Sequence, residues 1–268
     1  MGTSTDRPAG RSDELEAREE AGLPLELKTT LLILRRGSIR IRGLFEFGSN
    51  YTFLCDITDL RHPAPPASIR AVYKPTQGER PLWDFPMGSL ARREVAAFWV
   101  SQVLGWELVP ATVLRQEGPY GEGSLQEYRD LDLGQNYFTL RETRPELLQR
   151  VALFDTLINN ADRKAGHVLL DRNGHLWLID HGICFHSEPK LRTVIWDFAG
   201  ETIPPQLVRD LTSFRERLTS QVGLRRNLLQ YLSGEELAAL ERRSGALIRS
   251  GRYPRPGPGR SVPWPVWL

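Results

Sequence analysis

The sequence predicts an α+β fold built from two lobes, a small antiparallel β-rich N-terminal lobe and a mainly helical C-terminal lobe. The first half carries short runs of strand-type residues between turn-forming residues, as in Ser38–Phe45 and Ile69–Lys74. The second half carries longer segments whose apolar residues recur at helical spacing, as in Leu147–Ile158. With 268 residues, of which 40% are hydrophobic, the chain is long enough for a large core.

Composition narrows the class of protein. The formal net charge of +2 argues against non-specific binding to nucleic acid. No apolar run reaches the roughly 18 residues of a membrane span, and the first residues are charged, so we expect a cytoplasmic protein. Cys55 and Cys184 are the only cysteines, too few for a disulfide framework or a structural zinc site.

The N-terminal lobe is expected over residues 25–128, after a polar segment, residues 1–24, that we expect to be disordered. Strand patterns follow in order, separated by a turn at Phe47–Asn50 and a Pro-rich loop at His62–Ala67. The expected strands are Leu31–Leu34, Ser38–Phe45, Tyr51–Asp56 and Ile69–Lys74. They should form a small antiparallel sheet.

One helix should interrupt the strands of this lobe. Ser89 is of the N-cap type, apolar residues recur at helical spacing from Leu90 to Leu104, and Gly105 stands where a terminating glycine belongs. Two strands, Val109–Arg115 and Gly123–Tyr128, follow the helix, and the second should lead into the next lobe.

The C-terminal lobe is expected over residues 129–250. Thr143-x-x-Glu146 is a capping-box pattern with Pro145 in the first turn, and it predicts a helix that runs through Ile158. Further helices are expected at Gln206–Thr219, Leu224–Tyr231 and Gly234–Ser250. Residues 251–268 form a Pro-rich tail, which we expect to pack on the helical lobe; contact with a membrane interface is the alternative. Its cationic and aromatic residues include Arg252, Arg255, Arg260, Trp264 and Trp267.

The stretch Asn159–Phe185 carries the candidate chemistry. Asn173-Gly174 is typical of a type I′ turn, so we expect a hairpin with arms Val168–Asp171 and His175–Ile179. Pairing of the arms would bring three side chains to one end of the hairpin: Asp162, His167 and Asp180. Phosphoryl transfer needs one carboxylate to handle the acceptor hydroxyl and another to hold a metal ion on the phosphates.

The pattern D-R-x-x-x-H at Asp162–His167, followed by a hairpin and I-D-x-G at Ile179–Gly182, resembles the catalytic and metal loops of the phosphatidylinositol 3-/4-kinase-like superfamily. Type II phosphatidylinositol 4-kinases and HipA-type kinases are the most similar branches, and an uncharacterised bacterial branch is expected. The resemblance implies a protein-kinase-like bilobal fold, ATP with Mg²⁺ or Mn²⁺ as cofactors, and a nucleotide in the cleft between the lobes.

Site residues follow from this comparison. Asp162 would handle the acceptor, Arg163 would be an electrostatic partner for the loop or the phosphate, and Asp180 would bind metal. Lys74, at a strand end in a Lys-poor chain, would draw in the phosphates, with Glu94 as its partner and Glu79 as the fallback. Arg92 and Arg93 are expected in solvent. Backbone groups of Gly48, Ser49 and Asn50 would cover the phosphates, and those of Gln126, Glu127 and Tyr128 would bind adenine.

His167 is a departure from the superfamily pattern, which has Asn at this position. Imidazole is a poorer ligand for Mg²⁺ than an oxygen and suits Mn²⁺ or Zn²⁺ better. His167 therefore predicts one metal, a preference for Mn²⁺, or altered or lost catalysis. His181 could also face the metal. The alternatives to a kinase are a nucleotidyl (AMP) transferase on the same fold and a nucleotide-binding pseudokinase acting as a regulatory module. The acceptor stays open among a small molecule, a lipid headgroup and a protein.

Overall fold

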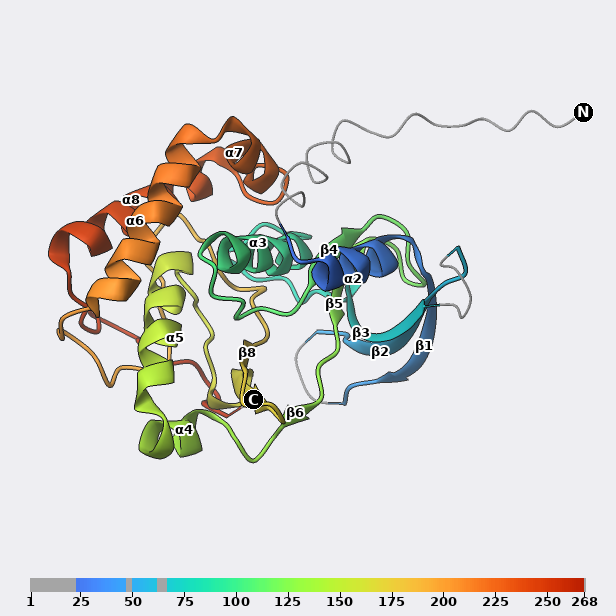
Figure 1. Ribbon diagram of the computed structural model, residues 1–268, viewed down its shortest axis with the longest axis horizontal. Coiled ribbons are helices and arrows are strands. Elements are labelled where there is room, and N and C mark those ends of the chain that lie inside the picture. Colours follow the sequence, from blue (N-terminus) through green and yellow to red (C-terminus); the bar gives the residue numbers. More distant parts are fainter. Residues whose placement is uncertain (1–22, 47–49, 62–66, 268) are drawn as a thin grey trace, which may run out of the picture.

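The computed structural model describes residues 23–46, 50–61 and 67–267, and it shows two lobes joined through the middle of the chain (Figure 1). In this described part, the N-terminal lobe holds a five-stranded antiparallel sheet of order β1-β2-β3-β5-β4. Its strands are β1 (Ser38–Leu44), β2 (Phe53–Asp59), β3 (Ala67–Pro75), β4 (Thr112–Arg115) and β5 (Gly123–Glu127). The α+β fold class expected from the sequence is confirmed.

The segment before β1 is a helix, α2 (Leu25–Arg36), so the strand expected at Leu31–Leu34 is wrong. Leu27, Leu31 and Leu34 recur at intervals of four and three residues and pack on the core, which is helical periodicity. A run of four apolar residues inside this pattern looks like a buried strand when it is read alone. Of the segment expected to be disordered, residues 1–22 lie outside the described residues.

Helix α3 (Leu90–Val103) lies between the sheet and the C-terminal lobe (Figure 1), and 12 of its 14 residues are buried. It ends before Gly105, whose φ of +69° is the left-handed conformation that glycine adopts freely. Ser89 occupies the N-cap position, but its hydroxyl donates to the carbonyl of Pro86 at 2.7 Å instead of capping the helix. The Glu79 carboxylate does so, accepting the Ala91 N–H at 2.9 Å.

The described C-terminal lobe contains five further helices and a small antiparallel sheet of order β6-β7-β8. The helices are α4 (Tyr137–Thr143), α5 (Pro145–Ile158), α6 (Pro205–Ser220), α7 (Val222–Leu228) and α8 (Gly234–Ser250). The strands are β6 (Leu131–Asp132), β7 (Val168–Asp171) and β8 (Leu176–Leu178). Short 3₁₀ turns stand at η1 (Thr76–Gly78) and η2 (Ala165–His167).

The capping box expected at Thr143-x-x-Glu146 is absent from the described chain. Thr143 is the last residue of α4, and its hydroxyl donates to the Thr139 carbonyl. Arg144 takes the N-cap position of α5 without a side-chain cap, and Pro145 stands at the first helical position. The capping box lies one helix earlier, between Asn136 and Thr139, because a short helix that the sequence pattern did not reveal precedes α5.

The hairpin of β7 and β8 forms as expected, but its turn differs from type I′. A type I′ turn needs positive φ at both central residues. Gly174 has a φ of +79°, whereas Asn173 is not among the positive-φ residues of the described chain. The Asp171 carboxylate accepts the N–H groups of Asn173 and His175, at 2.8 and 3.0 Å, and this side chain stabilises a longer connection.

The tail after α8 packs along the C-terminal lobe and ends against η2. The N–H groups of Ala165 and Gly166 donate to the carbonyls of Val266 and Trp267, at 2.9 and 3.0 Å. The Trp267 ring lies 4.5 Å from that of Phe138, between ring centres. Within the described residues, no helix is both long and apolar enough to cross a membrane.

Candidate active site

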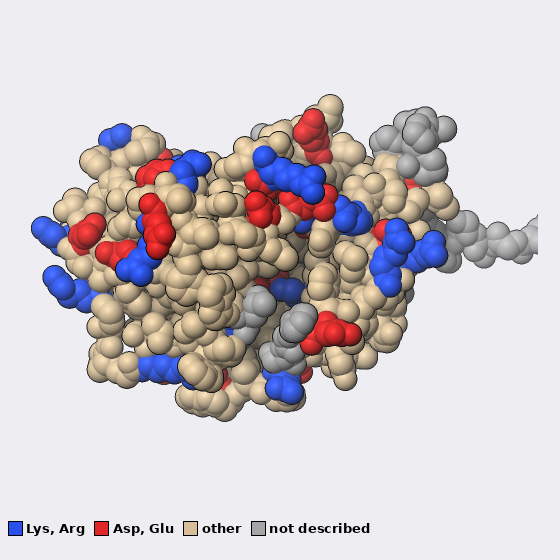
Figure 2. Space-filling model, turned by 90° about the horizontal axis from the view of Figure 1, so that it is seen from below, with Lys and Arg blue, Asp and Glu red and all other residues tan. Residues whose placement is uncertain are grey.

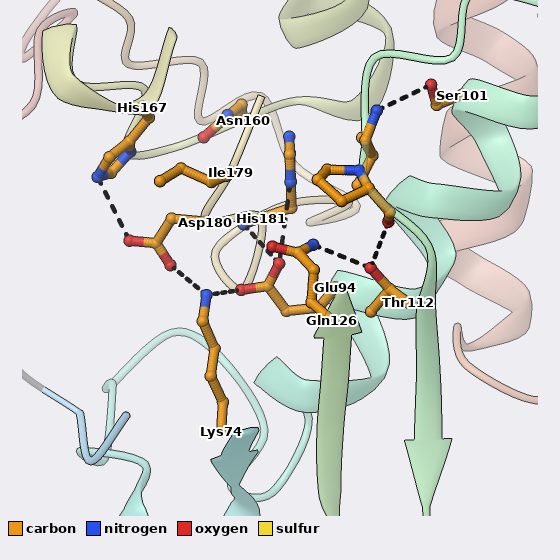
Figure 3. Close-up of polar contacts among 12 residues, drawn as sticks. Lys74, Glu94, Ser101, Thr112, Gln126, Asn160, His167, Ile179, Asp180 and His181 are labelled. Atoms are coloured by element: carbon orange, nitrogen blue, oxygen red, sulfur yellow. Dashed lines mark hydrogen bonds and ion pairs between the residues drawn. The ribbon is translucent and has the colours of Figure 1, made fainter. Parts of the chain in front are cut away.

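Three charged residues from three elements meet where the lobes face each other (Figure 3). Lys74 comes from β3, Glu94 from α3, and Asp180 follows β8. The Lys74 ammonium forms an ion pair with Glu94 and donates to Asp180 Oδ1 at 3.1 Å. Burial alone would lower the pKa of Lys74, but the charges of Asp180 and Glu94 raise it, so the ammonium stays charged. Figure 2 shows the surface hollowed between the lobes, with charged side chains at the base.

Asp180 adopts a left-handed backbone conformation, with a φ of +63°. That conformation is strained for a residue with a Cβ, and such strain is commonly found at functional sites. Its side chain is 50% exposed, so the carboxylate stays accessible to a ligand although the Lys74 ammonium contacts Oδ1. The Lys74 charge holds the pKa of Asp180 well below its usual range, so the carboxylate is ionised at any physiological pH.

His167 lies beside Asp180, with 3.4 Å between Nε2 and Oδ2. Burial lowers its pKa to about 4, so the imidazole is neutral at pH 7. Its Nδ1 is buried and has no hydrogen-bond partner among the described residues. A neutral imidazole next to an ionised carboxylate is a donor set that fits a divalent cation.

The metal-ligand set is small. Among the described residues there is no group of three or more His, Cys, Asp and Glu side chains that could hold a metal ion. Asp180 and His167 could therefore supply only part of a coordination sphere, and phosphate oxygens and water would have to supply the rest. That division is usual for ions that bind together with nucleotide phosphates.

Asp162 sits in the loop between α5 and η2. Its backbone N–H donates to Asn160 Oδ1 at 2.9 Å, and Lys164 Nζ lies 3.3 Å from its carboxylate. Burial raises the pKa of Asp162 to about 6, although the Lys164 charge opposes the rise. A carboxylate with a pKa near neutrality, partly open to solvent, is suited to accept a proton.

Arg163 is completely buried, which excludes a phosphate as its partner and leaves the loop. Its Nε donates to both carboxylate oxygens of Asp155 at 3.0 Å, and Nη1 donates to the carbonyl of Ile179 at 2.9 Å. Asp155 also accepts from Asn160 Nδ2 at 3.0 Å. The Asp155–Arg163 pair therefore ties the Asp162 loop to the strand that leads into Asp180. The sequence offered one signal for Asp155, a carboxylate within the apolar stripe of α5.

His181 does not face the metal position with its ring. The ring is buried against Phe154 and its Nε2 lies 2.9 Å from Arg163 Nη2. Burial, and then the Arg163 charge, keep the pKa of His181 well below its usual range. The part of His181 that contacts the Lys74–Glu94–Asp180 group is its backbone N–H, which donates to Glu94 Oε2 at 2.9 Å.

One expectation in this region is wrong. Arg93 is buried rather than solvated, because its guanidinium is held inside the protein by partners from the C-terminal lobe. Glu79, the fallback partner of Lys74, caps α3 instead. Arg92 is partly exposed and bridges Glu122 with the carbonyl of Gln230.

The structure describes four of the six residues expected to contact the nucleotide through their backbone. Gly48 and Ser49 are outside the described residues, and Asn50 Oδ1 accepts the Arg80 N–H at 2.7 Å. Gln126 is buried and donates to Thr112 Oγ1 at 2.9 Å (Figure 3). The N–H groups of Glu127 and Tyr128 donate to the carbonyls of Ala111 and Arg70 at 2.8 and 2.9 Å. These two N–H groups form backbone hydrogen bonds of the N-terminal lobe.

Comparison with solved structures shows what kind of fold this is. The Golgi casein kinase with Mn and ADP bound matches with a TM-score of 0.53 at 17% identity, over 84% of this chain and 75% of that one. The Helicobacter pylori proinflammatory kinase CtkA matches with a TM-score of 0.53 at 13% identity, over 81% and 95%. Hydra Fam20 with sugar has a TM-score of 0.53 at 16% identity, over 86% and 89%. The fold is therefore protein-kinase-like.

Sequence comparison shows the family. Protein Rv2133c of Mycobacterium tuberculosis is 36% identical to this chain, in an alignment that covers 88% of the chain and 94% of the relative. The chain belongs to the same family as Rv2133c. Phosphatidylinositol 4-kinase gamma 4 of Oryza sativa subsp. japonica is 33% identical over 144 residues, 45% of this chain and 25% of the rice protein. No family model matches the chain.

Proposed function

We propose that the protein is an ATP- and metal-dependent phosphotransferase of the phosphatidylinositol 3-/4-kinase-like superfamily, active on an alcohol acceptor. The observation that carries the proposal is the Lys74 ammonium held between the carboxylates of Glu94 and Asp180, 3.1 Å from the latter. A fixed cation beside an ionised, half-exposed carboxylate matches the requirements of a nucleotide–metal site in kinases. The D-R-x-x-x-H and I-D-x-G motifs and the partial match to the rice kinase support the superfamily assignment.

Each residue has a separate task in this proposal. Lys74 offsets phosphate charge, and Glu94 keeps the ammonium in place. Asp180 and His167 would hold the metal ion, and Asp162 would orient the acceptor hydroxyl and take its proton. ATP supplies the phosphoryl group, and the metal ion neutralises charge on the phosphates. Gly48, Ser49 and Asn50 are proposed over the phosphates, and Gln126, Glu127 and Tyr128 near the base.

Product analysis tests the proposal. The purified chain is incubated with ATP and either Mg²⁺ or Mn²⁺, together with pools of small hydroxylated metabolites, phosphoinositide vesicles or proteins as acceptors. Mass spectrometry of nucleotides and acceptors should show ADP and a phosphorylated product, and Asp162→Asn should remove that product. Formation of AMP and a nucleotidylated product would replace the proposal with nucleotidyl transfer. Binding of ATP without any turnover would favour a pseudokinase.

A further inference from the structure

Helix α3 is buried on nearly every side, and Arg93 is a fully buried cation of this helix with partners in the C-terminal lobe. The Arg93 side chain is 1% exposed. A charge that is buried this deeply is stable only when its donors are all satisfied by acceptors. The partners of Arg93 therefore show which parts of the protein hold this charge.

Two of these partners come from separate parts of the C-terminal lobe. Arg93 Nη1 donates to the carbonyl of Cys184, four residues after Asp180, and Nη2 forms an ion pair with Glu236 in the first turn of α8. Within the N-terminal lobe, Nε donates to Ser89 Oγ at 3.2 Å and the guanidinium lies 4.8 Å from the centre of the Phe85 ring. One side chain thus joins α3, the segment after Asp180 and α8.

Glu236 is held in place independently of Arg93. Its Oε2 accepts the Ser233 N–H at 2.9 Å, and its N–H donates to Ser233 Oγ at 3.2 Å, which completes the capping box of α8. The carboxylate that Arg93 meets is therefore pre-oriented by a helix terminus. Its remaining oxygen faces Arg93, so the pair forms with little loss of side-chain entropy.

Arg93 and Glu94 are consecutive, so the contacts of both side chains hold the same turn of α3. Glu94 contacts Lys74 and accepts the His181 N–H, while Arg93 contacts Cys184 and Glu236. A rotation of α3 that withdrew Glu94 from Lys74 would also break the hydrogen bonds of Arg93 to Cys184 and Glu236. Movement of this helix is therefore opposed by a buried charge that would lose its partners.

We propose that Arg93 is a positioning residue, a latch that keeps α3 on the C-terminal lobe and Glu94 on Lys74 in the absence of nucleotide or activator. The consequence for catalysis rests on the proposed phosphotransferase function, but the latch itself does not. The Lys74–Glu94 pair is preassembled in this protein, and any control of activity acts elsewhere than on the position of α3.

The two cysteines provide the test. Cys184 and Cys55 are both fully buried, the first beneath the latch and the second in the sheet core. The rate of modification of each thiol by a maleimide is followed by mass spectrometry in the ligand-free full chain, well below its unfolding temperature. Arg93→Met should raise the Cys184 rate at least tenfold and leave the Cys55 rate within twofold of the wild type.

Arg93→Lys serves if the Met variant does not fold. A lysine keeps the charge but lacks the planar fork that reaches two acceptors, so the Cys184 rate should rise here too. Ser233→Ala is the matched control, because it removes only the hydroxyl that caps α8 and keeps the Ser233 N–H that orients the Glu236 carboxylate toward Arg93. In this control, modification of Cys184 should become faster only by the amount that the loss of global stability explains. An unchanged Cys184 rate in both Arg93 variants, or an equal rise in Ser233→Ala, overturns the latch.

Nucleotide binding separates the latch from a purely structural role. With the latch broken, Arg93→Lys should weaken ATP binding by about tenfold although Arg93 cannot touch the nucleotide, whereas Ser233→Ala should bind ATP like the wild type. An Arg93→Lys variant with a faster Cys184 rate and unchanged ATP affinity contradicts the positioning role. If the wild type itself fails to bind ATP, the proposed function is wrong, and the thiol modification rates still test whether Arg93 holds α3 on the C-terminal lobe.

Discussion

The backbone N–H of His181 donates to Glu94 Oε2 at 2.9 Å, while the other oxygen of the same carboxylate is paired with Lys74. A single side chain of α3 therefore fixes both the cation of β3 and the residue directly after Asp180. The position of the candidate metal ligand and that of the phosphate-binding cation are coupled through Glu94, and this coupling can be measured.

Glu94→Ala should cost about 2 kcal/mol of unfolding free energy, because it leaves the partly buried Lys74 ammonium with one partner fewer and the His181 N–H unpaired. Denaturant unfolding measures the loss. Glu94→Gln is the control, since its carboxamide oxygen can still accept the His181 N–H, and it should lose less. Equal losses in the two variants would show that the hydrogen bond to His181 contributes nothing.

Asp162→Asn should make the protein more stable and inactive. Burial raises the pKa of Asp162 from 3.8 to about 6, so the folded state favours the protonated carboxyl. The stability contributed by this residue is complete below about pH 4 and is lost as the pH rises through about 6. The variant should therefore gain about 1–2 kcal/mol over the wild type at pH 7, and nothing at pH 3.5.

Denaturant unfolding without metal or nucleotide, across this pH range, measures the gain. A variant that is less stable than the wild type at pH 7 would mean that the Asp162 carboxylate is held by favourable contacts. The residue would then be structural rather than a group held ready for proton transfer.

His167→Asn should shift metal preference toward Mg²⁺, since a carboxamide oxygen is a harder ligand than imidazole. The ratio of the ATP-dependent thermal shifts in Mn²⁺ and in Mg²⁺ measures the change. His175→Asn, at the far end of the hairpin with its Nε2 on the Glu107 carbonyl, makes the same substitution away from Asp180 and should leave the ratio unaltered. An identical ratio in His167→Asn removes this residue from the metal site.

Trp267→Ala should weaken the attachment of the tail to η2 by roughly 1 kcal/mol, because the ring contact with Phe138 is lost. Activity should fall, since the backbone of Ala165 and Gly166 is held by this part of the tail. Trp264→Ala is the control, because Trp264 is largely exposed. If both variants behave like the wild type, the tail has no part in positioning the catalytic loop.

Local sequence patterns predicted several of the residues of the candidate site. A strand-end lysine in a Lys-poor chain, a helix with a glutamate in its second turn, and two aspartates around a hairpin are visible in the sequence, and the structure brings Lys74, Glu94 and Asp180 together. They could be found because each signal, whether strand alternation, a helix boundary or a turn, spans only a few consecutive residues.

The supporting contacts could not be found this way. Arg93 looks like a surface residue in a sequence, since burial of its guanidinium depends on Cys184 and Glu236, 91 and 143 positions away. Asp155 and Arg163 likewise pair only after α5 and the loop have packed. The error at Leu31–Leu34 has a local cause: four consecutive apolar residues fit a buried strand and a helix equally well.

The most direct test of the central claim is thermal unfolding with ATP, comparing no metal, Mg²⁺ and Mn²⁺, with Asp180→Ala as the control. Ligand at a hundred times its dissociation constant adds about 2.7 kcal/mol, a shift of several degrees for a chain of this size. We expect a metal-dependent shift in the wild type and none in Asp180→Ala. Absence of any shift in the wild type, or an equal shift in Asp180→Ala, would contradict a nucleotide–metal site at Lys74, Glu94 and Asp180.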